Sequence, residues 1–151
     1  MHTIQSERVA NIWAELDPLL VEHWREVAHY QDITLDVDRE RYESLEESGK
    51  LRCFTARVEG KLVGYLVYFV NTNAHYQGSL QAVQDVFFVD PEHRGSRLGA
   101  ELLVASHWHL MSEGVQVVMQ HVKVKQSLDF GPMLKTLGYE HVEAIYCKRL
   151  D

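Results

Sequence analysis

The chain has 151 residues, about the length of one domain, and its 46% hydrophobic content is enough for one core of ordinary size. Fifteen Lys and Arg against 22 Asp and Glu give a net charge of −7, the wrong sign for binding nucleic acid through its phosphates but compatible with cationic, amine-bearing substrates. No apolar run approaches the roughly 20 residues of a membrane span. Two distant cysteines without a secretory signal indicate free thiols, so we expect a soluble, cytoplasmic protein.

The N-terminal third is predicted to be helical. Ser6 is placed to cap a helix whose apolar residues recur at helical spacing until Asp17-Pro18 interrupts them, and a second helix is predicted to begin there. Residues 31–37 look extended. Asp38 is then placed to cap a short charged helix that ends near Gly49.

Beyond residue 50 the pattern indicates a sheet with helical crossings. The predicted elements are strands at 51–58 and 61–70 joined by a hairpin turn, a loop at 71–79, a strand at 80–89, a helix at 98–112, a strand at 115–122, a helix at 127–137 and a closing strand at 141–149. This order predicts a mixed α/β (α+β) domain around one twisted sheet.

Residues 85–104 carry the most informative pattern, a buried strand followed by a proline-marked turn, a glycine-containing loop and an amphipathic helix. The first-turn N–H groups of such a helix point outward at its positive end, which suits a phosphate or pyrophosphate. Gly95 and Gly99 would let an anion approach the backbone. Neither a dinucleotide-binding fingerprint nor a P-loop is present. If the loop is considered without its flanking residues, the alternative is that it forms a tight strand-to-helix turn and binds no ligand.

The order Val89-x-Pro91-x-x-Arg94-Gly95-x-x-x-Gly99, with Leu137-Gly138-Tyr139 further on, resembles the acetyl-CoA-binding motif of the GCN5-related N-acetyltransferase (GNAT) superfamily. Arg97 stands where the family's middle glycine is usual. The resemblance covers residues 50–150 well and the first 45 loosely, because the family's first strand is not evident. It implies one domain over 1–151 with a mixed, mostly antiparallel sheet flanked by helices. Residues 1–50 would form a helical substrate side, and residues 51–151 the sheet and acetyl-CoA-binding core.

The resemblance also implies a cofactor site and a reaction. Acetyl-CoA would be held mainly by main-chain N–H groups, and its acetyl group would pass to the primary amine of a small molecule by direct attack on the thioester. The implied cofactor-binding residues are Phe87, Phe88, Val89, Arg94, Gly95, Ser96, Arg97, Leu98, Gly99 and Ala100.

A second departure from the family, at Leu134, keeps other functions open. Leu134 stands where the family has the tyrosine that protonates the departing thiolate, so Tyr139, Tyr146, Ser127 or solvent would have to donate. A protein or modified-nucleotide amine is an alternative acceptor. A non-catalytic coenzyme A-binding module is another alternative.

Asp85 is the candidate catalytic residue, as general base or amine ligand. Strict alternation along its strand would place it with Val83, Phe87 and Val89, and an apolar face raises the pKa of a carboxyl unless a cation pairs with it. A structural ion pair or exposure to solvent is the alternative. The candidate substrate-binding residues are Glu26, His29, His75, Tyr76 and His121, each of which could also be an ordinary surface or core residue.

The histidines and cysteines show no metal-ligand spacing, so no metal is expected. Three short motifs are similar to bacteriophage-encoded members of the superfamily: His23-Trp24-Arg25-Glu26, Tyr42-x-x-Leu45-Glu46-x-x-x-Gly49 and Glu143-x-x-Tyr146-x-Lys148. The expected partner is the amine substrate, with no nucleic acid and no membrane. A homodimer is left open.

Overall fold

The computed structural model describes the main chain of residues 1–151 and every side chain except that of Gln126. The chain divides into two compact units, Met1–His121 and Val122–Asp151. The first unit contains a five-stranded sheet with three helices of at least two turns, and the second contains two short helical segments. No helix in the described residues is long and apolar enough to cross a bilayer.

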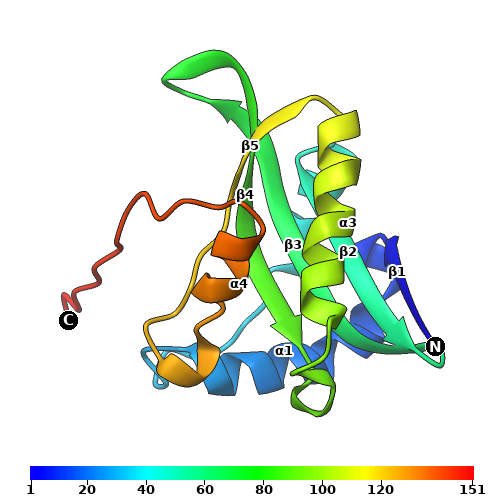
Figure 1. Ribbon diagram of the computed structural model, residues 1–151. Coiled ribbons are helices and arrows are strands. Elements are labelled where there is room, and N and C mark those ends of the chain that lie inside the picture. Colours follow the sequence, from blue (N-terminus) through cyan, green and yellow to red (C-terminus); the bar gives the residue numbers. More distant parts are fainter. The chain divides into compact units, whose positions relative to one another are not determined.

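The sheet has the strand order β1-β2-β3-β4-β5, with β1 at His2–Ser6, β2 at Leu51–Val58, β3 at Lys61–Asn73, β4 at Tyr76–Val89 and β5 at Val115–Met119 (Figure 1). The first three neighbouring pairs are antiparallel, and β4 and β5 are parallel. A parallel pair needs a crossover connection, which the helix α3 (Leu98–Ser112) supplies. The prediction of a mixed, mostly antiparallel sheet flanked by helices is confirmed.

The prediction for the N-terminus was wrong, because residues 2–6 form β1 and Ser6 caps no helix. β1 pairs with β2 from His2 opposite Val58 to Ser6 opposite Phe54. A five-residue strand that is exposed on both faces has almost no hydrophobic alternation. Its strand conformation is set by hydrogen bonds to β2, which a local sequence pattern does not reveal.

The helix α1 (Trp13–Val27) runs without a break through Pro18, where two separate helices were predicted. Pro18 lacks the N–H that would bond four residues back, so the helix loses one internal hydrogen bond. Leu16 and Leu19 lie on either side of Pro18 and both are buried. Packing of both halves against the same core offsets the local cost, because tertiary burial commonly overrides helix propensity.

The helices α1 and α2 (Arg39–Glu47) cover one face of the sheet. As predicted, Asp38 caps α2, accepting a hydrogen bond from the Arg41 N–H at 3.0 Å. The core beneath these helices comprises Val9, Ile12, Leu16, Leu19, Leu51, Cys53, Leu62, Tyr65, Val67 and Phe88, with Tyr42, Leu45 and Phe69 packed at its margin.

The helix α3 covers the opposite face and has the predicted bounds. It buries Leu98, Leu102, Leu103, Ser106 and Leu110. The hydroxyl of the fully buried Tyr68 in β3 lies 3.4 Å from the Ser106 hydroxyl, and the Phe54 ring of β2 contacts His109 edge-on with centroids 5.3 Å apart. These contacts hold the second half of α3 against β2 and β3, and Gly99 packs the start of α3 against Phe87 and Val89 at the end of β4, where the candidate site lies.

The predicted loop at 71–79 is mostly strand. β3 continues to Asn73 and β4 begins at Tyr76, so only residues 74 and 75 form the turn. This part of the hairpin projects beyond the rest of the sheet as a two-stranded ribbon (Figure 1). Its side chains are largely exposed, and its Asn, Gly and Ser residues therefore resemble a loop in sequence.

In the Val122–Asp151 unit, the predicted helix at 127–137 is replaced by two short segments, a 3-10 turn at Gln126–Leu128 and the helix α4 at Gly131–Thr136. Pro132 is placed in the first turn of α4, where a missing N–H costs little, so Gly131-Pro132 begins a helix there. The predicted strand at 141–149 is also wrong. These residues are exposed and have no regular secondary structure, because the described residues of this unit include no strand to pair with them.

Candidate active site

The parallel strands β4 and β5 pair only along part of their length. The last pair joins Val83 and Met119, and β4 then continues to Val89 alone on that side. Just past this point the Gln84 side chain accepts a hydrogen bond from the main-chain N–H of His121 at 3.0 Å. Among the described residues, no strand pairs with the β5-facing edge of β4 beyond Val83. The main-chain groups of that edge therefore have no strand partner there, and the Val89 carbonyl accepts a hydrogen bond from Arg94 Nε instead.

Asp85 lies in a β-bulge of β4. Val86 is opposite Val67 and Gln84 is opposite Tyr68, so Asp85 is the extra residue, with no partner on β3. A bulge inserts one residue into the alternation of the strand, and every side chain beyond it changes face relative to strict alternation.

The predicted face of Asp85 was therefore wrong in part. Asp85 points to the side covered by α1 and α2, as do Val86 and Phe88, which pack against the core there. Phe87 and Val89 instead face α3, where a Cβ atom on Gly99 would lie 3.6 Å from Phe87 Cζ and 3.9 Å from Val89 Cγ2.

The half-buried carboxylate of Asp85 accepts a hydrogen bond from the hydroxyl of Tyr42 in α2. Burial raises the pKa of Asp85 above its ordinary value, and the hydrogen bond from Tyr42 and the nearby charge of His121 offset part of that rise. The direction matches the prediction made from the apolar character of the strand. His121 is exposed, so the alternative of a core histidine is excluded.

The loop between β4 and α3 is held by its own side chains. Asp90 Oδ1 accepts from the Glu92 N–H at 2.9 Å, and the Ser96 hydroxyl donates to the His93 carbonyl at 2.7 Å. Ser96 Oγ also accepts from the Leu98 N–H at 3.3 Å. Gly95 has a φ of +79°, in the left-handed region that favours glycine. The loop conformation is thus fixed up to the first residue of α3.

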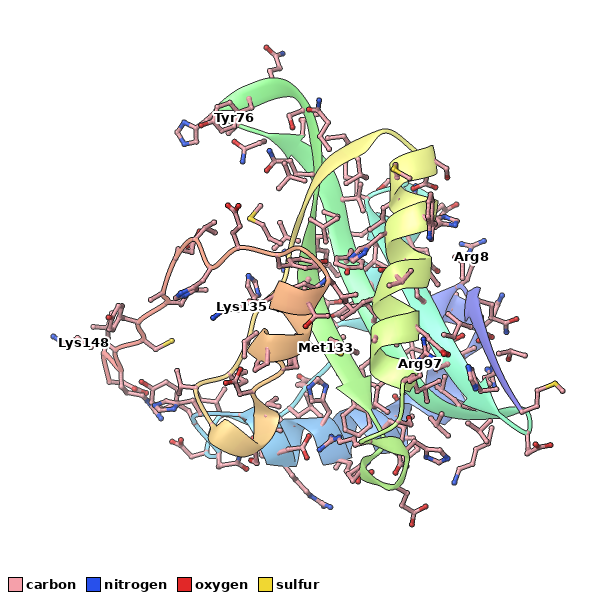
Figure 2. The ribbon with its side chains drawn as sticks, viewed as in Figure 1. Arg8, Tyr76, Arg97, Met133, Lys135 and Lys148 are labelled. Atoms are coloured by element: carbon pink, nitrogen blue, oxygen red, sulfur yellow. The ribbon has the colours of Figure 1, made fainter. Side chains whose placement is uncertain are left out.

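Five main-chain N–H groups at this loop and helix start have no acceptor among the described residues: those of Gly95, Ser96, Arg97, Gly99 and Ala100. They lie at the positive end of the α3 dipole. The exposed Arg97 precedes the helix directly, as Figure 2 shows. Unpaired N–H groups beside an arginine form an arrangement that fits a phosphate or pyrophosphate.

The two glycines of the motif have different roles. Gly95 meets the conformational demand of the loop. A side chain at Gly99 would point at Phe87 and Val89 on the strand, so Gly99 allows α3 to pack closely on the sheet. The expectation that Gly99 lets an anion approach the backbone is not supported by this geometry.

The guanidinium of Arg94 is hydrogen-bonded within the protein. Its two terminal nitrogens donate to the carboxylate of Glu26, at 2.7 and 2.6 Å, and its Nε donates to the Val89 carbonyl at 2.7 Å. The guanidinium also lies over the Phe88 ring, 5.4 Å from its centroid. Glu26, predicted as a substrate residue, is therefore an ion-pair partner of the loop.

The other predicted substrate residues do not come together. His29 is exposed and contacts the Tyr30 ring edge-on, with centroids 4.7 Å apart. His75 and Tyr76 lie at the hairpin tip, and Tyr76 and Arg97 are at opposite ends of the unit (Figure 2). Tyr76 and Asp85 are nine positions apart along β4, which corresponds to roughly 30 Å at about 3.3 Å per residue. A small amine cannot contact both.

Sequence reasoning missed Tyr42 as a site residue. It lies 43 positions from Asp85, on another element. The bulge, which puts Asp85 and Val86 on the same side of the strand, leaves no signal in the residue pattern. Only the helical spacing of Tyr42 and Leu45, which places both on one apolar side of an otherwise charged helix, could have suggested that Tyr42 reaches the sheet.

Leu134 is buried in α4. Tyr146, an alternative proton donor, is 93% exposed. Among the described side chains, no group of three or more His, Cys, Asp or Glu residues is arranged to hold a metal ion.

The chain belongs to the acetyltransferase (GNAT) family, because the model of that family matches residues 13–130. No curated protein matches the sequence. Members of this family are acyltransferases that use acetyl-CoA as a rule.

Similar solved structures share the fold at low sequence identity. A ribosomal-protein-alanine N-acetyltransferase from Brucella melitensis biovar Abortus 2308 is 17% identical over 99% of both chains, with a TM-score of 0.76. An aminoglycoside acetyltransferase from an uncultured soil metagenomic sample, in complex with sisomicin, is 21% identical over 99% of this chain and 97% of that chain, with a TM-score of 0.74. A glucosamine-6-phosphate N-acetyltransferase from Arabidopsis thaliana is 16% identical over 100% and 99%, with a TM-score of 0.74.

Proposed function

We propose that this protein transfers the acetyl group of acetyl-CoA to the primary amine of a small molecule, with Asp85 as the catalytic base. The observation that carries the proposal is the set of five unpaired N–H groups at the start of α3, next to the open edge of β4. The N–H groups would hold the pyrophosphate, and the strand edge would hold the amide-bearing arm of the cofactor.

Bound acetyl-CoA would supply an acetyl group activated as a thioester. An amine is mostly protonated at neutral pH and must lose a proton before its nitrogen can attack. Asp85 can take that proton, since burial raises its pKa toward the working pH. Proton transfer of this kind is typically worth about 10² to 10⁴-fold in rate.

The class of acceptor is inferred from charge and from the neighbours. The net charge of −7 favours a cationic acceptor. Similar structures include enzymes named for aminoglycosides, for glucosamine-6-phosphate and for a ribosomal protein. A small amine is therefore the first candidate, and a protein amine is an alternative. The resemblance of three short motifs to bacteriophage-encoded members, noted from the sequence alone, keeps a modified-nucleotide amine as a third.

A non-catalytic coenzyme A-binding protein is the second candidate function. Leu134 favours it, because a leucine cannot donate a proton to the thiolate. The two functions differ in whether an amine causes thiol release, and both require the same cofactor site.

The experiment measures thermal unfolding with acetyl-CoA, and then thiol release with sisomicin, glucosamine-6-phosphate and a peptide with N-terminal alanine. A hundredfold excess of acetyl-CoA over its Kd should stabilise the protein by about 2.7 kcal/mol. Arg97→Glu should weaken acetyl-CoA binding while preserving the fold, because a carboxylate at a helix start stabilises the helix but repels pyrophosphate. Arg97→Gln is the matched control for loss of the positive charge.

Absence of any stabilisation by acetyl-CoA would reject the proposal. Stabilisation without thiol release from any of the three amines would favour the non-catalytic alternative.

A further inference from the structure

The hydroxyl of Tyr42 binds only one of the two carboxylate oxygens of Asp85, Oδ2. Among the described residues, none donates a hydrogen bond to Oδ1. The carboxylate is therefore fixed at one oxygen and retains a second oxygen that can accept a proton or a hydrogen bond from an amine.

Tyr42 is held in place from two sides. Its ring contacts Trp13 of α1 edge-on, with centroids 6.0 Å apart, and lies 6.3 Å from the ring of Phe69 in β3. The Trp13 indole N–H donates to Glu43 Oε1 at 2.7 Å, which ties Trp13 to α2. A donor held by packing and hydrogen bonds loses little freedom when it orients its acceptor.

The contact lies at the bulge, where Asp85 has no cross-strand partner. A regular strand would place residue 85 in a cross-strand pair. As the extra residue, Asp85 instead extends toward α2 on the same side as Val86. Tyr42 therefore acts on a group that the strand itself leaves unpaired.

We propose that Tyr42 is a positioning residue for the acceptor amine: it fixes Oδ2 of Asp85 and leaves Oδ1 to take the proton of the amine. This inference rests on the proposed function. The balance of the step is simple, since the N–H bond of the ammonium breaks, an O–H bond forms on Oδ1, and the nitrogen keeps the electron pair for attack on the thioester.

The charge state of the pair supports this role. Burial, and then the charge of Asp85, raise the pKa of Tyr42, so the phenol keeps its proton and acts as the donor. A hydrogen bond to the ionised form of a carboxyl lowers the pKa of that carboxyl. The titratable groups near the pair are Arg41 on α2, Tyr65 on β3 and His121 after β5.

The test is Tyr42→Phe, which keeps the ring and removes only the hydroxyl. Without this hydrogen bond, the pKa of Asp85 should rise by about one unit, the scale of one hydrogen bond to a charged group. The acid limb of kcat/KM, measured with whichever of the three amines is acetylated, should move up by the same amount. At a pH on the old limb the activity should fall about tenfold, and above the new limb it should stay within about twofold of wild type.

Tyr65→Phe is the matched control, because it removes a buried hydroxyl on the same face that bonds His23 and not Asp85. Its acid limb should not move. A shared shift in both variants, or an unmoved limb in Tyr42→Phe, would overturn the inference.

Carboxyl NMR separates this inference from the proposed function. The ¹³Cγ resonance of Asp85, identified by its absence in Asp85→Asn, should titrate about one unit higher in Tyr42→Phe even if no amine is acetylated. If none of the three amines causes thiol release, the result favours the non-catalytic function over the proposed enzyme. The titration of Asp85 then still decides whether Tyr42 and Asp85 are in contact. If Tyr42→Phe does not fold, a downfield hydroxyl proton in the wild-type protein, lost in Asp85→Asn, supports the contact. Its absence in the wild type rejects the contact.

Discussion

Breaking the ion pair between Glu26 and Arg94 should loosen the candidate cofactor loop by a predictable amount. The pair is bidentate, with N···O distances of 2.6 and 2.7 Å. The Arg94 side chain is 34% exposed and the Glu26 side chain is 26% exposed. An exposed pair is worth about 0.2 to 1 kcal/mol, and bidentate geometry with partial burial places this one near the upper limit, at about 1 kcal/mol.

Arg94→Ala should cost more than the pair alone. It also removes the hydrogen bond to the Val89 carbonyl, worth about 1 kcal/mol, and the contact with the Phe88 ring, worth about 0.5 to 1 kcal/mol. We expect Arg94→Ala to lower the free energy of unfolding by about 2.5 to 3 kcal/mol in total.

A double-mutant cycle in urea isolates the pair. Arg94→Ala, Glu26→Ala and the double variant should give a coupling energy of about 1 kcal/mol, and the cycle with Glu22→Ala, one helical turn earlier, should give less than about 0.3 kcal/mol. Glu26→Ala should also weaken acetyl-CoA binding several-fold, because the loop N–H groups lose their fixed positions. A coupling energy no larger than that of the Glu22 cycle would refute the assignment of Glu26 as a support of the loop.

Two further predictions concern the glycines and the missing tyrosine. Gly99→Ala should leave acetyl-CoA affinity unchanged and keep or raise the free energy of unfolding, since the new Cβ would make ordinary contact with Phe87. Gly95→Ala should lower the free energy of unfolding by about 1 kcal/mol, because residue 95 has a left-handed backbone conformation. Calorimetric titration and urea unfolding check both, and a loss of affinity in Gly99→Ala would contradict the packing role. Leu134→Tyr should raise kcat at unchanged acetyl-CoA affinity if a proton donor is what turnover lacks, and steady-state kinetics with thiol detection measures this. No gain would indicate that solvent or another group protonates the thiolate.

The core elements of the fold could be predicted because their sequence signals are local. The helix over 98–112 and the hairpin at Glu59-Gly60 each combine a hydrophobic period with a stop or turn residue inside a short window. The loop before α3 could be predicted for the same reason. It depends on Pro91, Gly95 and the helix start, which are contiguous.

The elements that were missed depend on partners distant in sequence. β1 is a strand only because β2 pairs with it some 50 residues later, and α1 passes Pro18 only because Leu16 and Leu19 share one core. Their local patterns carry none of this information.

The side chains of the site show the same limit. Asp85 could be selected as a polar residue on an apolar strand. Its partner Tyr42 could not, since it lies 43 positions away on another element. The faces of Phe87 and Val89 could not either, since they follow from one extra residue in β4. Likewise, no spacing rule joins Glu26 to Arg94.

The bulge in β4 also bears on how this site can change during evolution. Because Asp85 has no cross-strand partner, its replacement by another residue type disturbs no ladder pair and shifts no register. Deletion of Asp85 would leave Gln84 opposite Tyr68 and Val86 opposite Val67, so the neighbouring side chains would keep their faces and only the carboxylate would be lost. The residue at this position can therefore be exchanged or lost during evolution without disturbing the pairing of β3 and β4.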